Sequence, residues 1–355
     1  MDRSDMRASV RGLEMYYNPK IEPGTLRMDT NTNVLGSNPA AEAYLRSARP
    51  SLDGYPNTYS DGLRDALASL YGLERENFVA GNGSDEMLNT VYTAFAEPGK
   101  TVCTYPCPSY SLYTYFIALA SGVPREVDLD QEFQADPDEI AGKGEASKGI
   151  LIMPSPNNPT GNTFRKKDVE EIISKHEGIV IMDEAYSEYA RTTLAPKVEE
   201  FDNLVVLKTF SKAYAMANLR VGYAVSNRKV AGMLNAVKVP YSLNTLSEGA
   251  AIAAVGDQDF IKRSVDMVAE QRPKLAADLR KLGFEPFPSD SNFILARSPI
   301  DHGLMIEGMK KRKVLIRDFG SKRRTENCVR MTVGTQELNA RMLKAMEDTL
   351  QEADR

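Results

Sequence analysis

The stretch LVVLKTFSKAYAMANLRVGYAVS, residues 204–226, contains two apolar runs joined by a polar turn that carries a lysine. The runs LVVLKTF (204–210) and VGYAVS (221–226) have the length and β-branched content of buried strands. Thr209, Ser211 and Lys212 follow directly where the first run ends. We therefore predict that these three side chains lie together at one edge of a sheet.

The same pattern of apolar run, polar turn and helical stretch recurs along the chain. The other runs are FVAGNG (78–83), TVCTYP (101–106), ILIMPSP (150–156) and IVIMDEAY (179–186), with helix-like segments at 84–96 and 166–176. Strands that alternate with helices predict an α/β fold with a mostly parallel sheet covered on both faces. Ligands bind such sheets beyond the carboxyl ends of the strands. The polar residues at those ends are Gly83 to Asp85, Asn157, Asn158, Asp183 and Thr209 to Lys212.

The chain is long enough for two domains, at about 150 residues each. After residue 245 the pattern changes to a long helical region, short strands near 284–297, 314–319 and 328–335, and a closing helix. We predict an N-terminal arm (1–45) packed on the small domain, a large domain (46–245) and a small α+β domain (246–355).

Composition excludes several classes of protein. The net charge is −5 without a long basic run, which disfavours a nucleic-acid surface, and we read the cluster at 322–324 as a solvated loop. The charged N-terminus is not a signal peptide, and no stretch approaches the roughly 18 apolar residues of a membrane helix. With three cysteines, Cys103, Cys107 and Cys328, a disulfide framework is not expected, which fits a reducing cytosol. Cys103 and Cys107 lack the spacing of a zinc site and are interpreted as small apolar fillers.

Histidine chemistry is also disfavoured. The chain has two histidines, His176 and His302, both in polar contexts that predict surface positions. Without a suitable histidine, serine and cysteine triads and His-rich metal sites lose support. The chemistry then falls to Lys, Asp, Tyr or Arg side chains.

Three charged residues stand in unusual positions. Lys212 follows a buried strand, where a partly buried amine can be a nucleophile, although a solvated loop lysine is equally compatible. Asp183 ends an apolar run and needs a cation, a metal or strong donors, unless it caps a helix. Glu184 points to the opposite face of the strand, so paired-carboxylate hydrolysis is disfavoured. Arg330, inside CVRMTVGT, needs an anion, which is either a substrate carboxylate or a structural partner.

Two loops add weaker signals. SPNNPTG (155–161) predicts a sharp turn that can hold an Asn amide over a site. GNGSDE (81–86) follows a strand and opens a helix, whose free N–H groups can bind phosphate. Either loop can equally be structural.

Taken together, these motifs resemble the fold-type-I pyridoxal phosphate (PLP)-dependent aminotransferases, and within them the histidinol-phosphate aminotransferase branch. The motifs are NNPTG, DEAY, T-x-S-K-x7-R and R-x-T-V-G-T, and the resemblance runs from about residue 10 to residue 335. The resemblance implies fold type I, with a mostly parallel seven-stranded sheet in the large domain and a smaller α+β domain. It also implies a homodimeric transferase that works by ping-pong amino transfer, and the cysteine content adds the expectation that it is cytoplasmic.

The resemblance also assigns roles around the cofactor. Lys212 would bind PLP as a Schiff base and move the substrate proton, and Asp183 would pair with the ring nitrogen. Asn158 and Tyr186 would hydrogen-bond the ring oxygen, and Tyr110 would stack on the ring. The phosphate would be held by Ser84, Asp85, Thr209, Ser211, Arg220 and, from the neighbouring subunit, Tyr55.

Substrate contacts implied by the resemblance are Arg330 for the α-carboxylate and Arg317, Tyr16 and Asn31 in the substrate pocket. Here the sequence departs from the family. Met15 replaces the usual Pro, and the usual N-E-N-P reads Asn31, Thr32, Asn33, Val34. These changes bear on the substrate rather than on the cofactor.

Histidinol phosphate, with glutamate and 2-oxoglutarate, is the substrate expected first. An aminotransferase for aromatic or other amino acids of the same branch is the alternative, as is a decarboxylase resembling the threonine-phosphate enzyme. A non-catalytic PLP-binding regulator is disfavoured, because the residues before Tyr55 show no helix-turn-helix pattern.

Overall fold

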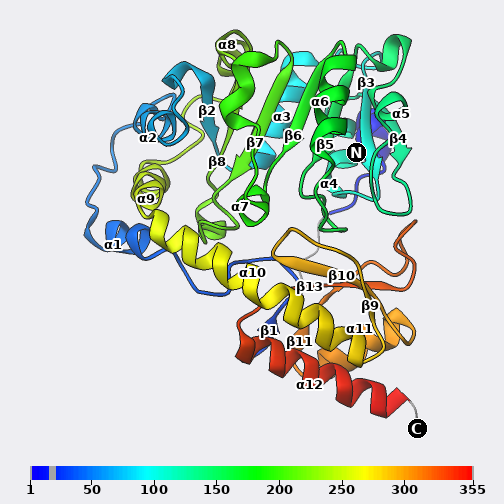
Figure 1. The fold of residues 1–355 in the computed structure, drawn as a ribbon. Coiled ribbons are helices and arrows are strands. Elements are labelled where there is room, and N and C mark those ends of the chain that lie inside the picture. Colours follow the sequence, from blue (N-terminus) through cyan, green and yellow to red (C-terminus); the bar gives the residue numbers. More distant parts are fainter. Residues whose placement is uncertain (1, 16–20, 354–355) are drawn as a thin grey trace.

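The computed structural model describes residues 2–15 and 21–353, and its centre is a seven-stranded sheet of order β2-β8-β7-β6-β5-β3-β4 (Figure 1). Strand β8 runs antiparallel to its neighbours β2 and β7, and the other neighbouring pairs are parallel. The strands are β2 (Phe78–Gly81), β3 (Val102–Cys107), β4 (Val123–Asp128), β5 (Ile150–Pro154), β6 (Ile179–Asp183), β7 (Leu204–Thr209) and β8 (Gly222–Ser226). The predicted α/β class with a mostly parallel sheet is confirmed.

The central strands are apolar throughout because both faces of the sheet are covered. Alternate residues of β7 enter different cores: Val205 and Leu207 join one cluster, and Leu204 and Val206 the other. The helices of this part of the fold are α2 (Asp61–Tyr71), α3 (Ser84–Phe95), α4 (Leu112–Leu119), α5 (Pro137–Ala141), α6 (Lys166–Lys175), α7 (Ser187–Ala190) and α8 (Arg228–Val237).

Strand β4 is the one strand of this sheet that no apolar run indicates. Its sequence VPREVD contains a proline and three charged residues, and most of its side chains are exposed. It forms the edge of the sheet, where such residues discourage further strand pairing.

A second, antiparallel sheet has the order β12-β13-β10-β9. Its strands are β9 (Glu285–Pro286), β10 (Phe293–Arg297), β12 (Arg317–Asp318) and β13 (Cys328–Thr332). The long helix α10 (Gln258–Lys281) crosses between the two parts of the molecule in Figure 1, with α11 (His302–Lys311) and α12 (Gln336–Ala353) beyond it. This α+β arrangement matches the expectation for the C-terminal part.

The N-terminal segment contacts both parts of the molecule. Strand β1 (Leu26–Arg27) pairs with β11 (Val314–Leu315), next to the second sheet. The short 3-10 helix η2 (Ala8–Val10) lies instead by α4, where Arg7 donates to the Leu119 carbonyl at 2.9 Å. Strand β1 and η2 therefore contact different parts of the molecule, and the division into an arm and two domains stays a prediction.

Helix α1 (Pro39–Ser47) packs closely on α9 (Thr245–Gly256). A Cβ at Gly249 would lie 2.1 Å from the Tyr44 ring, so only glycine permits this approach. The remaining 3-10 helices are η1 (Arg3–Asp5), η3 (Arg75–Asn77), η4 (Gly144–Ala146), η5 (Ala195–Glu200) and η6 (Ala217–Leu219).

His176 is buried, and its predicted surface position is wrong. It follows the end of α6, and its Nδ1 and Nε2 atoms lie 2.9 Å and 3.2 Å from the carbonyl oxygens of Ala141 and Gly149. Burial lowers the pKa of the imidazole. These two backbone acceptors give the ring the polar partners that make burial tolerable.

Candidate active site

A cavity of about 350 Å³ lies at the carboxyl ends of the parallel strands, between the two sheets. Its volume is in the range of cofactor and substrate pockets. The predicted site residues that line it are Asn31, Ser84, Asp85, Tyr110, Asn158, Asp183, Tyr186, Thr209, Ser211, Lys212, Arg220, Arg317 and Arg330. The structure thus brings together residues from both halves of the chain, and their individual roles stay predictions.

Lys212 is half-buried, just after β7 ends at Thr209. Its Nζ donates to the carbonyl oxygen of Thr30 at 3.1 Å and lies 5.4 Å from the centre of the Tyr186 ring. The amine therefore faces the cavity rather than open solvent, as a Schiff-base lysine requires.

Asp183 is the last residue of β6, beside β7 in the sheet. Its Oδ2 accepts a hydrogen bond from the Tyr113 hydroxyl at 2.7 Å, and its Oδ1 accepts one from the Ala185 amide at 3.1 Å. Burial raises the pKa of the carboxyl above its usual value, and these two hydrogen bonds oppose the rise.

Glu184 points away from Asp183, to the opposite side of the sheet, as predicted. Its carboxylate accepts from the Leu194 amide at 2.7 Å and lies 3.5 Å from the buried ammonium of Lys208. Glu188 also pairs with Lys208, at 2.8 Å. Asp183 and Glu184 therefore cannot act together on one substrate.

The part of the cavity lined by Arg220 and the start of α3 is suited to an anion. Helix α3 begins at Ser84, and no side chain caps its N-terminus at Gly83. The first amides of a helix are free donors. The Arg220 guanidinium lies 3.3 Å from the Asp85 carboxylate and 3.5 Å from the Ser211 hydroxyl.

Close backbone packing fixes the position of Arg220 beside the start of α3. A Cβ at Gly222 of β8 would lie 2.2 Å from the Ser84 amide nitrogen. Glycine at 222 therefore lets β8 approach the start of α3, which places Arg220 beside it.

Arg330 is a buried cation without an anionic partner in the described part of the chain. Its side chain donates to the Asn158 side-chain oxygen and, at 2.8 Å, to the Asp29 carbonyl, and its Nε has no partner among those residues. Burial lowers the pKa of the guanidinium to about 10. A carboxylate entering the cavity would supply the missing charge.

Tyr186 is buried beside Asn31. The Asn31 side-chain amide donates to the Tyr186 hydroxyl at 3.1 Å, and Asn31 itself adopts a left-handed backbone with φ 54°. Asn31 thus joins the N-terminal segment to the cavity wall through Tyr186.

Tyr55 does not line the cavity of its own chain. It is 85% exposed and stacks on Tyr241, with ring centres 4.9 Å apart. The predicted substrate contact Tyr16 lies outside the described residues.

Tyr113 is one of the cavity residues that the sequence analysis missed, and its hydroxyl contacts Asp183. Only Tyr110 is singled out in CPSYSLY, although Tyr113 lies three residues further on, about one helical turn away. That spacing places both tyrosines at the start of α4, and both line the cavity.

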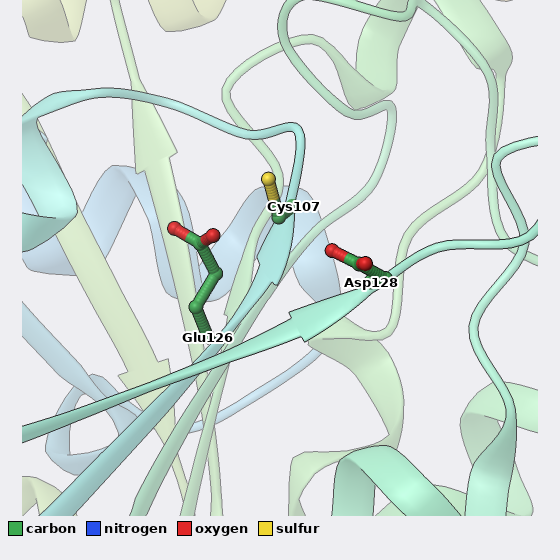
Figure 2. Close-up of side chains that lie close together, drawn as sticks. All are labelled: Cys107, Glu126 and Asp128. Carbon is green, nitrogen blue, oxygen red and sulfur yellow. The ribbon is translucent and has the colours of Figure 1, made fainter. Parts of the chain in front are cut away.

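One group of potential metal ligands is found among the described residues, at the β4 edge of the large sheet. Figure 2 shows Cys107 at the end of β3 with Glu126 and Asp128 on β4. The exposed Arg323 pairs with both carboxylates, at 2.9 Å for Glu126. Burial raises the pKa of the Cys107 thiol to about 11. The carboxylates therefore already have a cationic partner, and the thiol is protonated at neutral pH.

The sequence model of the family described as "Aminotransferase class I and II" matches residues 24–346, most of the chain and all the cavity residues. The chain belongs to this aminotransferase family. Membership confirms the predicted fold type, enzyme class and PLP cofactor.

Curated relatives of this aminotransferase match over nearly its whole length. It is 36% identical over 349 residues to a histidinol-phosphate aminotransferase of Thermoanaerobacter sp. (strain X514), covering 97% of this chain and 98% of the relative. It is 35% identical over 305 residues to the enzyme of the same name from Pyrococcus furiosus, covering 86% of each chain.

Solved structures share the fold. The histidinol-phosphate aminotransferase of Sinorhizobium meliloti, in complex with pyridoxal-5'-phosphate, superimposes with a TM-score of 0.87 at 23% identity, over 99% of this chain and 98% of that one. The L-threonine-O-3-phosphate decarboxylase of Porphyromonas gingivalis reaches 0.81 at 21% identity, over 92% and 99%. At these identities the likeness speaks for the fold alone, which accommodates more than one reaction.

The residues of the cavity fit PLP chemically. The uncapped N-terminus of α3, together with Arg220, suits a phosphate. The same cavity contains the Lys212 amine and the Asp183 carboxyl group, which suit the aldehyde and the ring nitrogen of PLP. Within the described residues, no helix combines the length and apolar composition needed to cross a membrane.

Proposed function

We propose that this aminotransferase exchanges the amino group between histidinol phosphate and the glutamate/2-oxoglutarate pair, in histidine biosynthesis. The near-full-length curated relatives support this substrate. Two arginines facing one cavity are the structural observation that carries the proposal.

Arg317 and Arg330 are direct partners across β12 and β13, so both side chains point to the same face of the sheet. Like charges opposite each other are destabilising, and the charge of Arg317 adds to burial in lowering the Arg330 pKa. An anionic group between them would relieve this repulsion. Histidinol phosphate offers a phosphate, and glutamate offers carboxylates.

The side chains of the cavity would hold the cofactor and transfer the substrate proton. PLP, when bound, supplies a ring that withdraws electrons from the substrate carbon next to the amine. Lys212 would hold the cofactor through its amine and then carry the proton of that carbon. Asp183 would keep the ring nitrogen protonated, and Asn158 and Tyr186 would donate to the ring oxygen.

Other residues would position the ligands. Ser84, Asp85, Thr209, Ser211 and Arg220 would hold the phosphate, and Tyr110 would cover the ring. Arg330 would fork onto a carboxylate with two parallel hydrogen bonds, while Asn31, Arg317 and Tyr16 would contact the rest of the substrate.

We also propose a homodimer in which Tyr55 reaches the cavity of the second copy. Leu52, Tyr55 and Val239 are 93%, 85% and 62% exposed, and Tyr241 beside Tyr55 is also exposed. A cluster of exposed large apolar side chains is typical of an interface. The three buried, unpaired cysteines fit the proposed cytoplasmic location.

A donor panel tests the substrate. Histidinol phosphate, Phe, Tyr and Asp are offered separately to the PLP-loaded enzyme, and amino transfer is followed by loss of the cofactor's visible absorbance. We expect the fastest loss with histidinol phosphate. Rapid reaction of Phe without reaction of histidinol phosphate would overturn the proposal in favour of an aromatic aminotransferase.

Carbon dioxide release is measured in parallel, with threonine phosphate as an additional substrate. We expect oxo-product formation and no carbon dioxide. Release of one carbon dioxide per threonine phosphate consumed, without oxo product, would identify a decarboxylase instead.

A further inference from the structure

Tyr113 is a fully buried tyrosine whose hydroxyl is directed at the cavity carboxylate. It lies in the first turn of α4, and its side chain joins the core cluster beneath the sheet. Its hydroxyl donates to Asp183 Oδ2 at 2.7 Å. Burial and the neighbouring carboxylate raise the pKa of the phenol well above its usual value, so it remains a hydrogen-bond donor at physiological pH.

The two oxygens of Asp183 receive one donor each. Tyr113 bonds Oδ2, and the Ala185 amide bonds Oδ1 from the other side at 3.1 Å. Two fixed donors hold the plane of a carboxylate, whereas a single donor would let it rotate. The orientation of Asp183 therefore depends on α4 as well as on its own strand.

The same ring also supports Tyr110. The rings of Tyr110 and Tyr113 meet edge to face, with centres 5.4 Å apart and planes at 86°. Such contacts favour one arrangement of the two rings. Tyr113 thus contacts both the residue expected to cover the cofactor ring and the carboxylate expected to face its nitrogen.

Four groups influence the pKa of the Asp183 carboxyl group in addition to its burial. The hydrogen bonds of Tyr113 and Ala185 and the charge of Lys212 lower its pKa, and the charge of Asp85 raises it. Tyr113 is the strongest of the opposing groups. Without the Tyr113 hydroxyl, only the Ala185 amide and the Lys212 charge would still lower the Asp183 pKa, while burial and Asp85 would continue to raise it.

We propose that Tyr113 is a positioning residue that fixes the Asp183 carboxylate in one orientation and keeps it ionised for the cofactor ring nitrogen. The inference rests on the proposed function, in which Asp183 faces that nitrogen. It adds a residue from α4 to a site otherwise assigned to the ends of the strands of the large sheet, to the start of α3 and to the small sheet.

Tyr113→Phe tests the proposal because it keeps the buried ring and removes only the hydroxyl. The pKa of Asp183 is measured in the cofactor-free protein by carboxyl carbon NMR, with the signal assigned from Asp183→Asn. We expect the pKa to rise by about one unit, the size of effect of a lost hydrogen bond to a charge. An unchanged pKa would overturn the proposal.

Tyr92→Phe is the matched control. Tyr92 is buried in the same core cluster, and its hydroxyl has no hydrogen-bond partner among the described residues. Its loss should leave the Asp183 pKa unchanged. An equal shift in both variants would mean that any disturbance of the core moves the carboxyl, and would also overturn the proposal.

The holoenzyme gives a second readout. In Tyr113→Phe we expect PLP to dissociate roughly tenfold more readily and kcat to fall, with little change in KM, because substrate contacts are untouched. Failure of the wild-type protein to bind PLP would instead refute the proposed function, and would leave the NMR result on Tyr113 standing. Wild-type PLP affinity and kcat in Tyr113→Phe would overturn the positioning role alone.

Discussion

At the scale of the residue, Arg330 is a buried cation that has no anionic partner among the described residues. It is 6% exposed, its donors meet only neutral oxygens, and burial lowers its pKa to about 10. A buried cation without an anion costs stability, so selection for folding alone does not account for it. The residue is better explained by a ligand that carries the negative charge.

Arg330→Met is therefore expected to separate binding from stability. We expect KM for 2-oxoglutarate to rise about 100-fold, since two charged hydrogen bonds are lost, while the melting temperature of the cofactor-free protein stays the same or rises. Steady-state kinetics and calorimetry check the two effects. Arg341→Met, which removes an exposed guanidinium bonded to the Gly24 carbonyl, is the control and should change neither. A large fall in melting temperature with an unchanged KM would show that Arg330 is structural.

At the scale of the element, β6 and β7 carry the site on one side and a buried ionic group on the other. Lys208 is 3% exposed and lies between Glu188 and Glu184, near the Tyr71–Tyr223 hydroxyl pair. Burial disfavours the Lys208 ammonium, but Glu188, Tyr71 and Glu184 outweigh it, and its pKa lies well above the usual value. The group ties β7, which leads to Lys212, to the segment that follows Asp183.

Lys208→Met should destabilise the protein by about 3–5 kcal/mol at neutral pH, because the buried Glu184 and the partly buried Glu188 lose their cation. Burial already raises the pKa of Glu184. A carboxyl with a raised folded-state pKa favours folding at low pH and loses that contribution as pH rises through this pKa. The loss should therefore be smaller at pH 5 than at pH 8, as measured by urea unfolding.

The control for this prediction is Lys274→Met, which breaks an exposed pair with Glu270 at 2.6 Å. Such surface pairs contribute little, and we expect a change below about 0.5 kcal/mol at either pH. If Lys208→Met were equally mild, the buried group would not be what holds β7 to the segment after β6.

At the scale of the whole molecule, the cavity combines residues that lie far apart in the sequence. Asn31, Asp183 and Arg330 come from the N-terminal segment, the large sheet and the small sheet. The loop after β12 is joined to the edge of the large sheet by Arg323, which pairs with Glu126 and Asp128. The geometry of the site thus depends on how the two sheets are held together.

Mixing two inactive variants tests the proposed dimer. Tyr55→Ala and Lys212→Ala should each lose most activity, and a dimer that pairs one chain of each contains one intact cavity. Random pairing at equal amounts should restore about a quarter of wild-type activity, as a symmetric dimer with shared sites requires. Dimers that form, by light scattering, without recovery would place Tyr55 outside the partner's site.

The sequence by itself determined the order of strands and helices and the residues that follow each strand. Short continuous apolar runs and polar turns are local signals, so six strands of the large sheet and the positions of Lys212 and Asp183 could be predicted from them. The family motifs then indicated most of the cavity.

Only the tertiary structure decided which groups complete each other. The edge strand β4 can carry three charged residues because most of its side chains are exposed. His176 can be buried because two distant carbonyl groups face it. The bond from Tyr113 to Asp183 joins residues seventy positions apart. Such contacts depend on burial and on the packing of elements that are far apart in the sequence, so a local sequence pattern cannot predict them.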